Sequence, residues 1–356
     1  MTRATGDAGS GCTTQEDRRR RFGVRAGRFG TIDGVRLSDS HDGTWALFAK
    51  RGATLIDWVV PFGGGLLSLT DGYRSKTELY AQNGVRNGVM VPFPNRIAGA
   101  RYHFGHRDHD LLPGVPEAER LIYHGFLRNL DLALVDTRAG EDGAEALFST
   151  DAIRPGAFPG YPFALTVHVR VRLGPEGLSL TITATNTGHL TAPYAAGWHP
   201  YFRLGDGSID TLELQVPAQA CIVTDASLLP LSGSAAYAAI ETRPELDFRT
   251  PRALGATMID AALASVQPDA DGMIRTRLRD PRRGCGLSVW QEGGLVHLFT
   301  GDTLARGARR SIAIEPVEVM TDAFNRSDCH TAIGLEPGAS RSFRCGAQFR
   351  AQMEMR

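Results

Sequence analysis

Apolar and polar residues alternate with a period of two along much of this chain. In residues 165–173 every second residue is Leu or Val, and in residues 178–184 the alternation returns after the turn at 174–177. Successive side chains of a β-strand point to opposite faces of its sheet, so a period of two marks a strand with one buried face. The pattern predicts an antiparallel hairpin over residues 165–185.

Similar alternation elsewhere favours an all-β fold. Two further hairpins are predicted, each with two apolar strands around a short turn, and one closing strand is expected near the C-terminus. These segments are residues 46–49 with 53–60, residues 287–290 with 295–300, and residues 338–349.

Helical segments are expected to be few and short, at residues 251–256 and 259–265. The 41 glycines and 19 prolines are spread along the chain rather than pooled in one linker. We therefore predict one large β-sandwich domain over residues 29–356. Residues 1–28 are rich in Gly, Thr, Asp and Arg and poor in large apolar residues, which predicts a flexible polar tail.

Charge and cysteine content narrow the class of protein. The chain has 39 basic and 39 acidic residues, so no net field favours nucleic acid or an anionic membrane as a partner. Its five cysteines form no C-x-x-C pair, which argues against a disulfide framework and a structural zinc site. The Arg run at residues 18–21 is not followed by an apolar segment, so no export signal is expected. We expect a cytoplasmic protein.

The first candidate for chemistry is a histidine among aromatic residues. His199 lies in Gly-Trp-His-Pro-Tyr-Phe-Arg, and Pro200 favours an extended backbone before it. Far downstream, Glu315 stands near the end of the apolar run Ser-Ile-Ala-Ile-Glu-Pro. An imidazole and a carboxylate at strand ends suit acid/base chemistry on a sugar ring. The alternative is a buried histidine bonded to a carbonyl and a carboxylate paired with an arginine.

Two loops supply candidate donors to substrate hydroxyl groups. Asn95 and Arg96 follow Pro94, and His124 precedes Gly125, so all three lie in segments punctuated by Gly or Pro. The alternative is a structural asparagine in a turn beside a solvated arginine.

Three further histidines do not indicate a metal site. His103, His106 and His109 lie in a segment that is predicted to form a hairpin with its turn near His106. A spacing of three on β structure does not keep the side chains on one face of a sheet. We expect no metal ion here.

In order and spacing these motifs resemble the aldose 1-epimerases (galactose mutarotases), from about residue 30 to the C-terminus. The resemblance implies a galactose mutarotase-like β-supersandwich whose open face holds a monosaccharide. The matching stretches are Pro94-Asn95-Arg96-Ile97, Tyr123-His124-Gly125-Phe126, Trp198-His199-Pro200-Tyr201-Phe202, Ile259-Asp260 and Ile314-Glu315-Pro316.

The resemblance also implies a mechanism. Glu315 takes a proton from the anomeric hydroxyl while a protonated His199, its pKa raised by a neighbouring carboxylate, gives one to the ring oxygen. This chemistry is redox-neutral and is expected to need no cofactor. The expected partner is a small sugar, bound by a monomer or homodimer. The residues expected to bind it are Arg96, His124, Asp260, Asn95 and Tyr201.

Two segments depart from the family pattern. Asn129 and Leu130 stand where relatives tend to carry an aromatic ring, and residues 317–321 replace a stretch that is often richer in proline. Both segments are expected near the pocket, so the wall that faces the substrate is expected to differ.

Three alternatives remain open at this stage. The first is an epimerase for a phosphorylated or otherwise modified sugar, with Arg74, Arg86 and Arg128 as phosphate contacts. The second is an enzyme for another ring-opening or cyclisation reaction in specialised metabolism. The third is a sugar-binding module without turnover.

Overall fold

Antiparallel strands dominate the computed structural model, which describes residues 20–354. The N-terminal segment forms a five-stranded sheet in simple sequence order. Its strands are β1 (Phe22–Phe29), β2 (Ile32–Asp39), β3 (Trp45–Ala49), β4 (Leu55–Phe62) and β5 (Gly65–Ser68).

A nine-stranded sheet forms the second layer. In spatial order its strands are β19 (Arg252–Ala253), β16 (Glu213–Gln215), β21 (Ile274–Asp280), β22 (Cys285–Gln291), β26 (Ser340–Arg350), β12 (Gly177–Asn186), β11 (Leu165–Gly174), β10 (Ala144–Ile153) and β9 (Ala133–Ala139). Strands β11 and β12 pair in register from Leu165↔Asn186 to Gly174↔Gly177. The hairpin predicted from the alternation is therefore confirmed, as is the closing strand β26.

An eight-stranded sheet carries the residues that matter most below. Its strands are β18 (Tyr237–Ala239), β17 (Ala218–Ile222), β20 (Asp260–Val266), β23 (Leu295–Phe299), β24 (Ile312–Val317), β14 (Gly197–Trp198) and β6 (Val89–Met90), with β15 (Tyr201–Phe202) also paired to β24.

Shorter elements connect and cover these sheets. Two small ladders pair β7 (Arg101–Phe104) with β8 (Arg107–Asp110) and β13 (Ala192–Pro193) with β25 (Gly334–Leu335). The α-helices are α1 (Lys76–Ala81) and α2 (His330–Ile333). The 3₁₀ turns are η1 (Asn83–Val85), η2 (Ala98–Ala100), η3 (Glu117–Glu119), η4 (Leu127–Asn129), η5 (Ile209–Thr211), η6 (Gly233–Ala236), η7 (Ile240–Thr242), η8 (Ala323–Asn325) and η9 (Ser327–Cys329).

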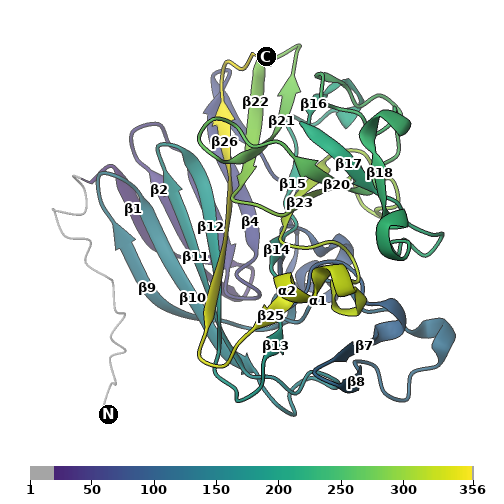
Figure 1. Ribbon diagram of the computed structural model, residues 1–356. Coiled ribbons are helices and arrows are strands. Elements are labelled where there is room, and N and C mark those ends of the chain that lie inside the picture. Colours follow the sequence, from purple (N-terminus) through teal and green to yellow (C-terminus); the bar gives the residue numbers. More distant parts are fainter. Residues whose placement is uncertain (1–19, 355–356) are drawn as a thin grey trace, which may run out of the picture.

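The large sheets pack face to face around one hydrophobic core. Strands β1, β2 and β4 lie behind β9 to β12 on the left of Figure 1, and β2 contacts both β10 and β11. Phe48 of β3, Phe148 of β10 and Val169 of β11 are fully buried between these two layers. The same core continues to Leu298 of the eight-stranded sheet. The all-β, single-domain prediction is confirmed.

The predicted polar tail ends too late in the sequence. Residues 22–29 form β1, which pairs with β2 from Phe22↔Asp39 to Phe29↔Ile32. Phe22 is 1% exposed, so one large apolar side chain and a full ladder of backbone bonds order this segment. The domain therefore begins by residue 22 rather than residue 29, and the rest of the predicted tail, residues 1–19, lies outside the described residues.

Two other expectations are wrong. Residues 287–290 and 295–300 are strands but form no hairpin, because β22 pairs with β21 and β26 whereas β23 pairs with β20 and β24. The turn between them carries the chain from one sheet to the other. The helix expected at 251–256 is a loop and turn that contains the two-residue strand β19, paired with β16. The helix expected at 259–265 is strand β20, because sheet partners on β17 and β23 satisfy its backbone groups.

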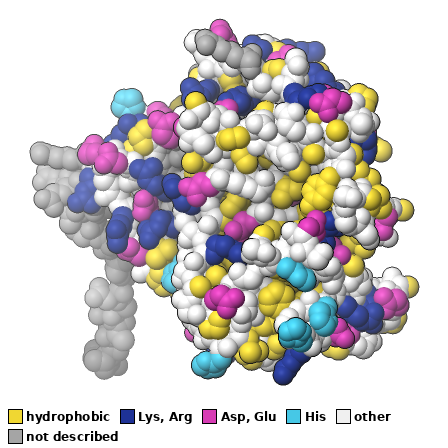
Figure 2. All heavy atoms as spheres, in the orientation of Figure 1, with side chains coloured by type: hydrophobic (Ala, Val, Ile, Leu, Met, Phe, Trp, Pro, Cys, Tyr) yellow, Lys and Arg dark blue, Asp and Glu magenta, His cyan; other side chains and the backbone are white. Residues whose placement is uncertain are grey.

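The surface shown in Figure 2 mixes charge of both signs. Basic and acidic side chains are interspersed over this face, as the equal numbers of the two types suggest. Within residues 20–354 no helix has the length and apolar character that a bilayer crossing requires.

Candidate functional site

His199 and Glu315 meet on the eight-stranded sheet. Glu315 lies within β24, and His199 directly follows β14, which pairs with the same strand. The Nε2 atom of His199 lies 3.3 Å from Oε1 of Glu315, and their side chains are 6% and 3% exposed. Gly197 of β14 allows this strand to pack closely between β6 and β24, because a Cβ there would meet the Met90 and Val317 side chains at 2.7 and 3.0 Å. The two residues singled out from the sequence are thus in direct contact.

Backbone and ring contacts hold His199 in place. Its N–H donates to the Gly88 carbonyl, and its own carbonyl accepts from the Asn87 N–H, each at 2.9 Å. The Tyr201 ring stacks on the imidazole, with centroids 4.9 Å apart and planes 15° apart. The Tyr201 hydroxyl donates to the Gly84 carbonyl at 2.7 Å. Tyr201 is therefore a support for His199 as well as a residue of the pocket wall.

The two predicted donor loops lie beside this pair. His124 has a φ of 59°, and its ring packs edge-on against His199 with centroids 5.1 Å apart. The next residue must be Gly125, because a Cβ there would lie 2.1 Å from the Val91 carbonyl oxygen. The Asn95 N–H donates to Nδ1 of His124 at 3.1 Å, so the other ring nitrogen carries the proton. Asn95 Oδ1 in turn accepts from the Arg96 guanidinium at 3.2 Å.

Asp260 reaches the same place from β20, together with a histidine that sequence reasoning missed. The Nε2 atom of His297, on β23, lies 2.8 Å from Oδ1 of Asp260. His297 is 8% exposed and stands directly opposite Glu315 in the β23–β24 register. The signal that could have revealed it is a single histidine inside the apolar run Leu-Val-His-Leu-Phe.

These side chains line a cavity of about 460 Å³. That volume lies in the range typical of small-molecule sites. Apolar residues complete its wall, and Leu121, which is 59% exposed, lies at its edge. The lining comprises Asn83, Gly84, Val85, Asn95, Arg96, Leu121, Tyr123, His124, His199, Tyr201, Asp260, His297, Phe299, Thr303, Leu304, Ala305 and Glu315.

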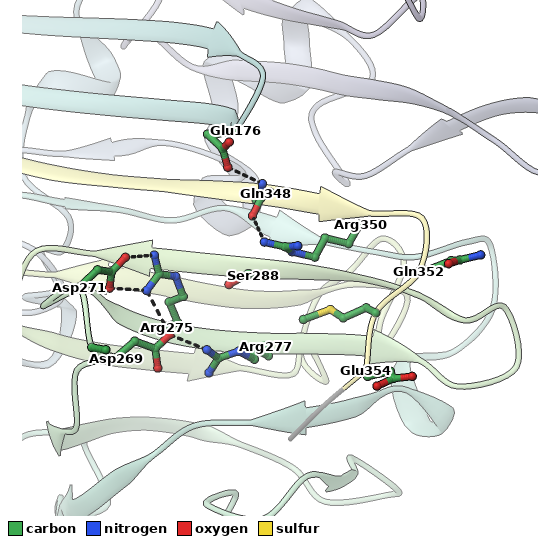
Figure 3. A pocket seen from close by; sticks show the side chains of 12 residues that line it. Glu176, Asp269, Asp271, Arg275, Arg277, Ser288, Gln348, Arg350, Gln352 and Glu354 are labelled. Atoms are coloured by element: carbon green, nitrogen blue, oxygen red, sulfur yellow. Dashed lines mark hydrogen bonds and ion pairs between the residues drawn. The ribbon is translucent and has the colours of Figure 1, made fainter.

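A second hollow, of about 550 Å³, lies elsewhere and lacks this chemistry. Figure 3 shows its charged side chains paired with one another: Arg275 with Asp269 and Asp271, and Arg277 with Asp269. No histidine is among the residues that line it in the described chain. Mutual pairing leaves these groups little capacity to bind a ligand, so the candidate site is the cavity around His199.

Burial decides where the proton of the His199–Glu315 pair resides. Burial raises the pKa of Glu315 to about 8. Burial, aided by the charge of His297, lowers the pKa of His199 to about 3. The expectation of a raised pKa for His199 is therefore wrong, because burial outweighs the nearby Asp260 carboxylate. Removing both groups from water favours a neutral pair, with the proton on Glu315 and the imidazole uncharged.

The second pair, His297 with Asp260, favours charged rather than neutral side chains. Burial opposes charge on His297, but Glu315 and the hydrogen bond to Asp260 outweigh it and raise the pKa of His297. Burial would also raise the pKa of Asp260, yet the His297 hydrogen bond lowers it. The pKa of His124 is far below its usual value, chiefly through burial. The hydrogen-bonded pair of His297 and Asp260 thus favours charged forms, whereas burial of His199 and Glu315 favours neutral ones.

The two segments expected to alter the pocket wall lie outside it. Asn129 is exposed and Leu130 packs against the core, and neither lines the cavity. Glu318, within the second segment, accepts from the Ala196 N–H at 2.6 Å instead. Tyr123 does line the cavity, so an aromatic ring is present in the wall.

The arginines considered for a phosphate group are also elsewhere. Arg86 is 1% exposed and forms an ion pair with Asp71. Arg128 donates to the Tyr123 carbonyl at 3.2 Å, and neither it nor Arg74 is among the residues that line the cavity. Arg96 is the only arginine in that lining within the described chain.

The three histidines of the β7–β8 hairpin make separate contacts. His103 lies 2.8 Å from Asp108, His109 stacks on Tyr102, and His106 occupies the turn with a φ of 63°. Among the described residues no group of three or more His, Cys, Asp or Glu side chains is arranged to hold a metal ion.

A comparison with known families accounts for this arrangement. The sequence model described as aldose 1-epimerase matches residues 35–348. The chain belongs to the aldose 1-epimerase family. This assignment covers both the His199 motif and the Glu315 strand, and it brings with it the expectation of isomerase-type chemistry.

Individual relatives of this aldose 1-epimerase family member are distant. The uncharacterized protein YihR of Escherichia coli K12 is 28% identical over 240 residues, which cover 67% of this chain and 71% of YihR. The crystal structure of a GalM/aldose epimerase homologue from C. elegans has a TM-score of 0.77 at 19% identity, covering 92% of this chain and all of that one. That of galactose 1-epimerase from Lactobacillus acidophilus has a TM-score of 0.76 at 16% identity, covering 94% and 100%. The galactose mutarotase-like fold is confirmed.

Proposed function

We propose that the protein is an aldose 1-epimerase that interconverts the α and β anomers of a free aldose. The observation that carries this proposal is the buried His199–Glu315 contact of 3.3 Å, which opens on a cavity lined by hydroxyl-binding groups. Family membership and the galactose 1-epimerase named among the structural neighbours support it. Arg96, His124 and Asp260 are the proposed partners of the ring hydroxyls, with Asn95 orienting two of them.

Ring opening needs one group that takes a proton and one that gives a proton. Glu315 as a carboxylate accepts the proton of the anomeric hydroxyl, and His199 as an imidazolium donates to the ring oxygen. The C1–C2 bond of the open aldehyde then rotates, and closure by the reverse transfers yields the other anomer. No electron is transferred, so these side chains suffice for the proton movements.

The resting state of the pair corresponds to the point just after ring opening. With its pKa raised to about 8, Glu315 holds the proton that the opening step would deliver to it. Transfer of that proton across the 3.3 Å contact to His199 prepares the pair for the next opening. Each opening converts the charged form of the pair into the neutral form, and each closure reverses this change. The pair therefore carries a single proton throughout.

The alternatives have less support. A phosphorylated sugar would need cationic groups in the wall, but Arg86 is committed to Asp71 and Arg96 is the cavity's one arginine in the described chain. A binding module without turnover would not need a carboxyl group whose pKa is raised to about 8 in contact with an imidazole. We therefore place the free-aldose epimerase first.

Direct measurement of anomer exchange tests the proposal. Purified protein added to α-galactose, α-glucose and hexose 6-phosphates should accelerate the approach to the anomeric equilibrium for at least one free aldose, followed by polarimetry or by NMR exchange spectroscopy. Exchange at the uncatalysed rate with every free aldose would contradict the proposal. Acceleration confined to the phosphates would favour the modified-sugar alternative.

The pH profile should differ from that of an ordinary catalytic histidine. The rate should fall above about pH 8, where the pair loses its proton, since the pKa of Glu315 is raised to about 8. It should stay level as the pH falls through about 6.5, the usual histidine value, because the pair takes up a second proton only near the lowered pKa of His199. Initial exchange rates from pH 5 to pH 9.5 measure this. A midpoint near 6.5 on the acid side would contradict the neutral pair.

A further inference from the structure

His297 occupies a central position between the two carboxyl groups of the site. Its strand, β23, lies between β20 and β24 in the eight-stranded sheet. It stands directly opposite Glu315 on β24, so the two side chains share one face of the sheet. On the other side its Nε2 atom bonds Asp260 Oδ1 at 2.8 Å. One imidazole thus links a residue proposed to bind substrate with the residue proposed to accept its proton.

Charged and titratable groups reach His297 from every neighbouring element. Asp260 favours a positive charge on its ring, and so does Glu315 in its carboxylate form. Burial opposes that charge, and so does the Arg96 guanidinium. His199 and His124 lie nearby, and burial lowers the pKa of each. The two carboxyl groups outweigh the opposition, which raises the pKa of His297.

We propose that His297, as an imidazolium, is a positioning residue that holds Asp260 in place and stabilises the carboxylate form of Glu315. The inference rests on the proposed epimerase function. Glu315 must become negative inside a buried site before it can accept the anomeric proton. A positive charge directly across the sheet favours that form without moving any atom, and the hydrogen bond to Asp260 keeps the imidazolium oriented.

Replacing His297 by Gln separates the charge from the hydrogen bond. The amide of Gln can still donate to Asp260, but it carries no positive charge. Loss of the nearby cation should raise the apparent pKa values of the His199–Glu315 pair, so the alkaline limb of kcat/KM should move to higher pH by about one unit. The plateau rate should fall about tenfold, since less of the pair is in the Glu315 carboxylate form. His103→Gln, on the exposed β7–β8 hairpin, is the matched control and should change neither.

The shift of the limb distinguishes this role from a purely structural one. A His297→Gln variant that is only less stable would lose rate at every pH and keep the wild-type limb, and that result would overturn the proposal. If this variant does not fold, Asp260→Asn replaces it. Removing that carboxylate should lower the pH at which the His297 ring titrates, and an unchanged titration would overturn the proposal.

A measurement without substrate separates this inference from the proposed function. Two-bond ¹H–¹⁵N correlation spectra of ¹⁵N-histidine-labelled protein at pH 7 should show an imidazolium that disappears in His297→Gln, while His199 remains neutral. A neutral His297 in a protein that exchanges anomers would overturn the inference and leave the epimerase function standing. An imidazolium at His297 in a protein that exchanges no sugar would support the charge assignment and refute the function.

Discussion

Replacing Glu315 by Gln should lower the rate of anomer exchange by about 10²–10⁴-fold while leaving the fold intact. The amide of Gln can neither accept the anomeric proton nor hand one to His199. Stability should change little, because Glu315 is uncharged in the resting site and Gln replaces it with a neutral group of the same shape. NMR exchange at pH 7 measures the rate, and thermal unfolding measures stability.

Two companion variants sharpen this test. Glu318→Gln lies three residues further along, outside the cavity lining, and should keep the wild-type rate. His199→Asn should lose activity to a similar extent, and the double variant with Glu315→Gln should lose little more, because two groups that share one proton act as a unit. Near-normal exchange by Glu315→Gln would remove the acid/base assignment altogether.

Replacing Asp71 by Asn should destabilise the protein by about 3–5 kcal/mol, the largest stability effect that we expect from a single polar substitution here. Asp71 pairs with Arg86, whose side chain is 2% exposed, and with Arg306 at 2.8 Å. An amide would leave the Arg86 guanidinium buried beside no negative charge. Arg306 also bonds Glu78 at 2.6 Å, so it retains one partner.

Urea unfolding at pH 7 should reveal this loss, and Asp33→Asn is the matched control. Asp33 pairs with Arg28 at the surface, where both side chains are more than half exposed, so its loss should cost at most about 1 kcal/mol. Burial alone would raise the pKa of Asp71, but Arg306 and Arg86 outweigh burial and lower it, so the stabilisation is present at neutral pH and is lost as the pH falls through that lowered pKa. Equal, small losses in both variants would show that the buried pair contributes little.

The Asp71 network also bears on the cavity. Arg306 follows Thr303, Leu304 and Ala305, which form one wall, and its ion pairs fasten that loop to the N-terminal half of the chain. The Arg86 guanidinium lies 5.3 Å from the centroid of the Tyr201 ring that supports His199. A less stable Asp71→Asn variant should therefore also bind sugar more weakly.

Sequence patterns predicted local structure well where a segment has one buried face. The β11–β12 hairpin follows from strict alternation, because each strand packs one side on the core. Prediction failed where a strand is buried on both faces, and where two consecutive strands belong to different sheets. A short helix was expected at residues 259–265, yet partners on β17 and β23 hold residues 260–266 as β20. Nothing local distinguishes the turn before β23 from a hairpin turn.

The sequence by itself indicated the family, the all-β class and the candidate residues His199, Glu315, Arg96, His124 and Asp260, because these residues lie in short motifs whose order and spacing are recognisable. Only the tertiary structure decided how the site is charged. A pKa depends on burial and on neighbours that are distant in sequence, and these place the proton on Glu315 rather than His199. The same reason explains why His297 went unnoticed: its partners, Asp260 and Glu315, are 37 and 18 residues away and meet it only across the sheet.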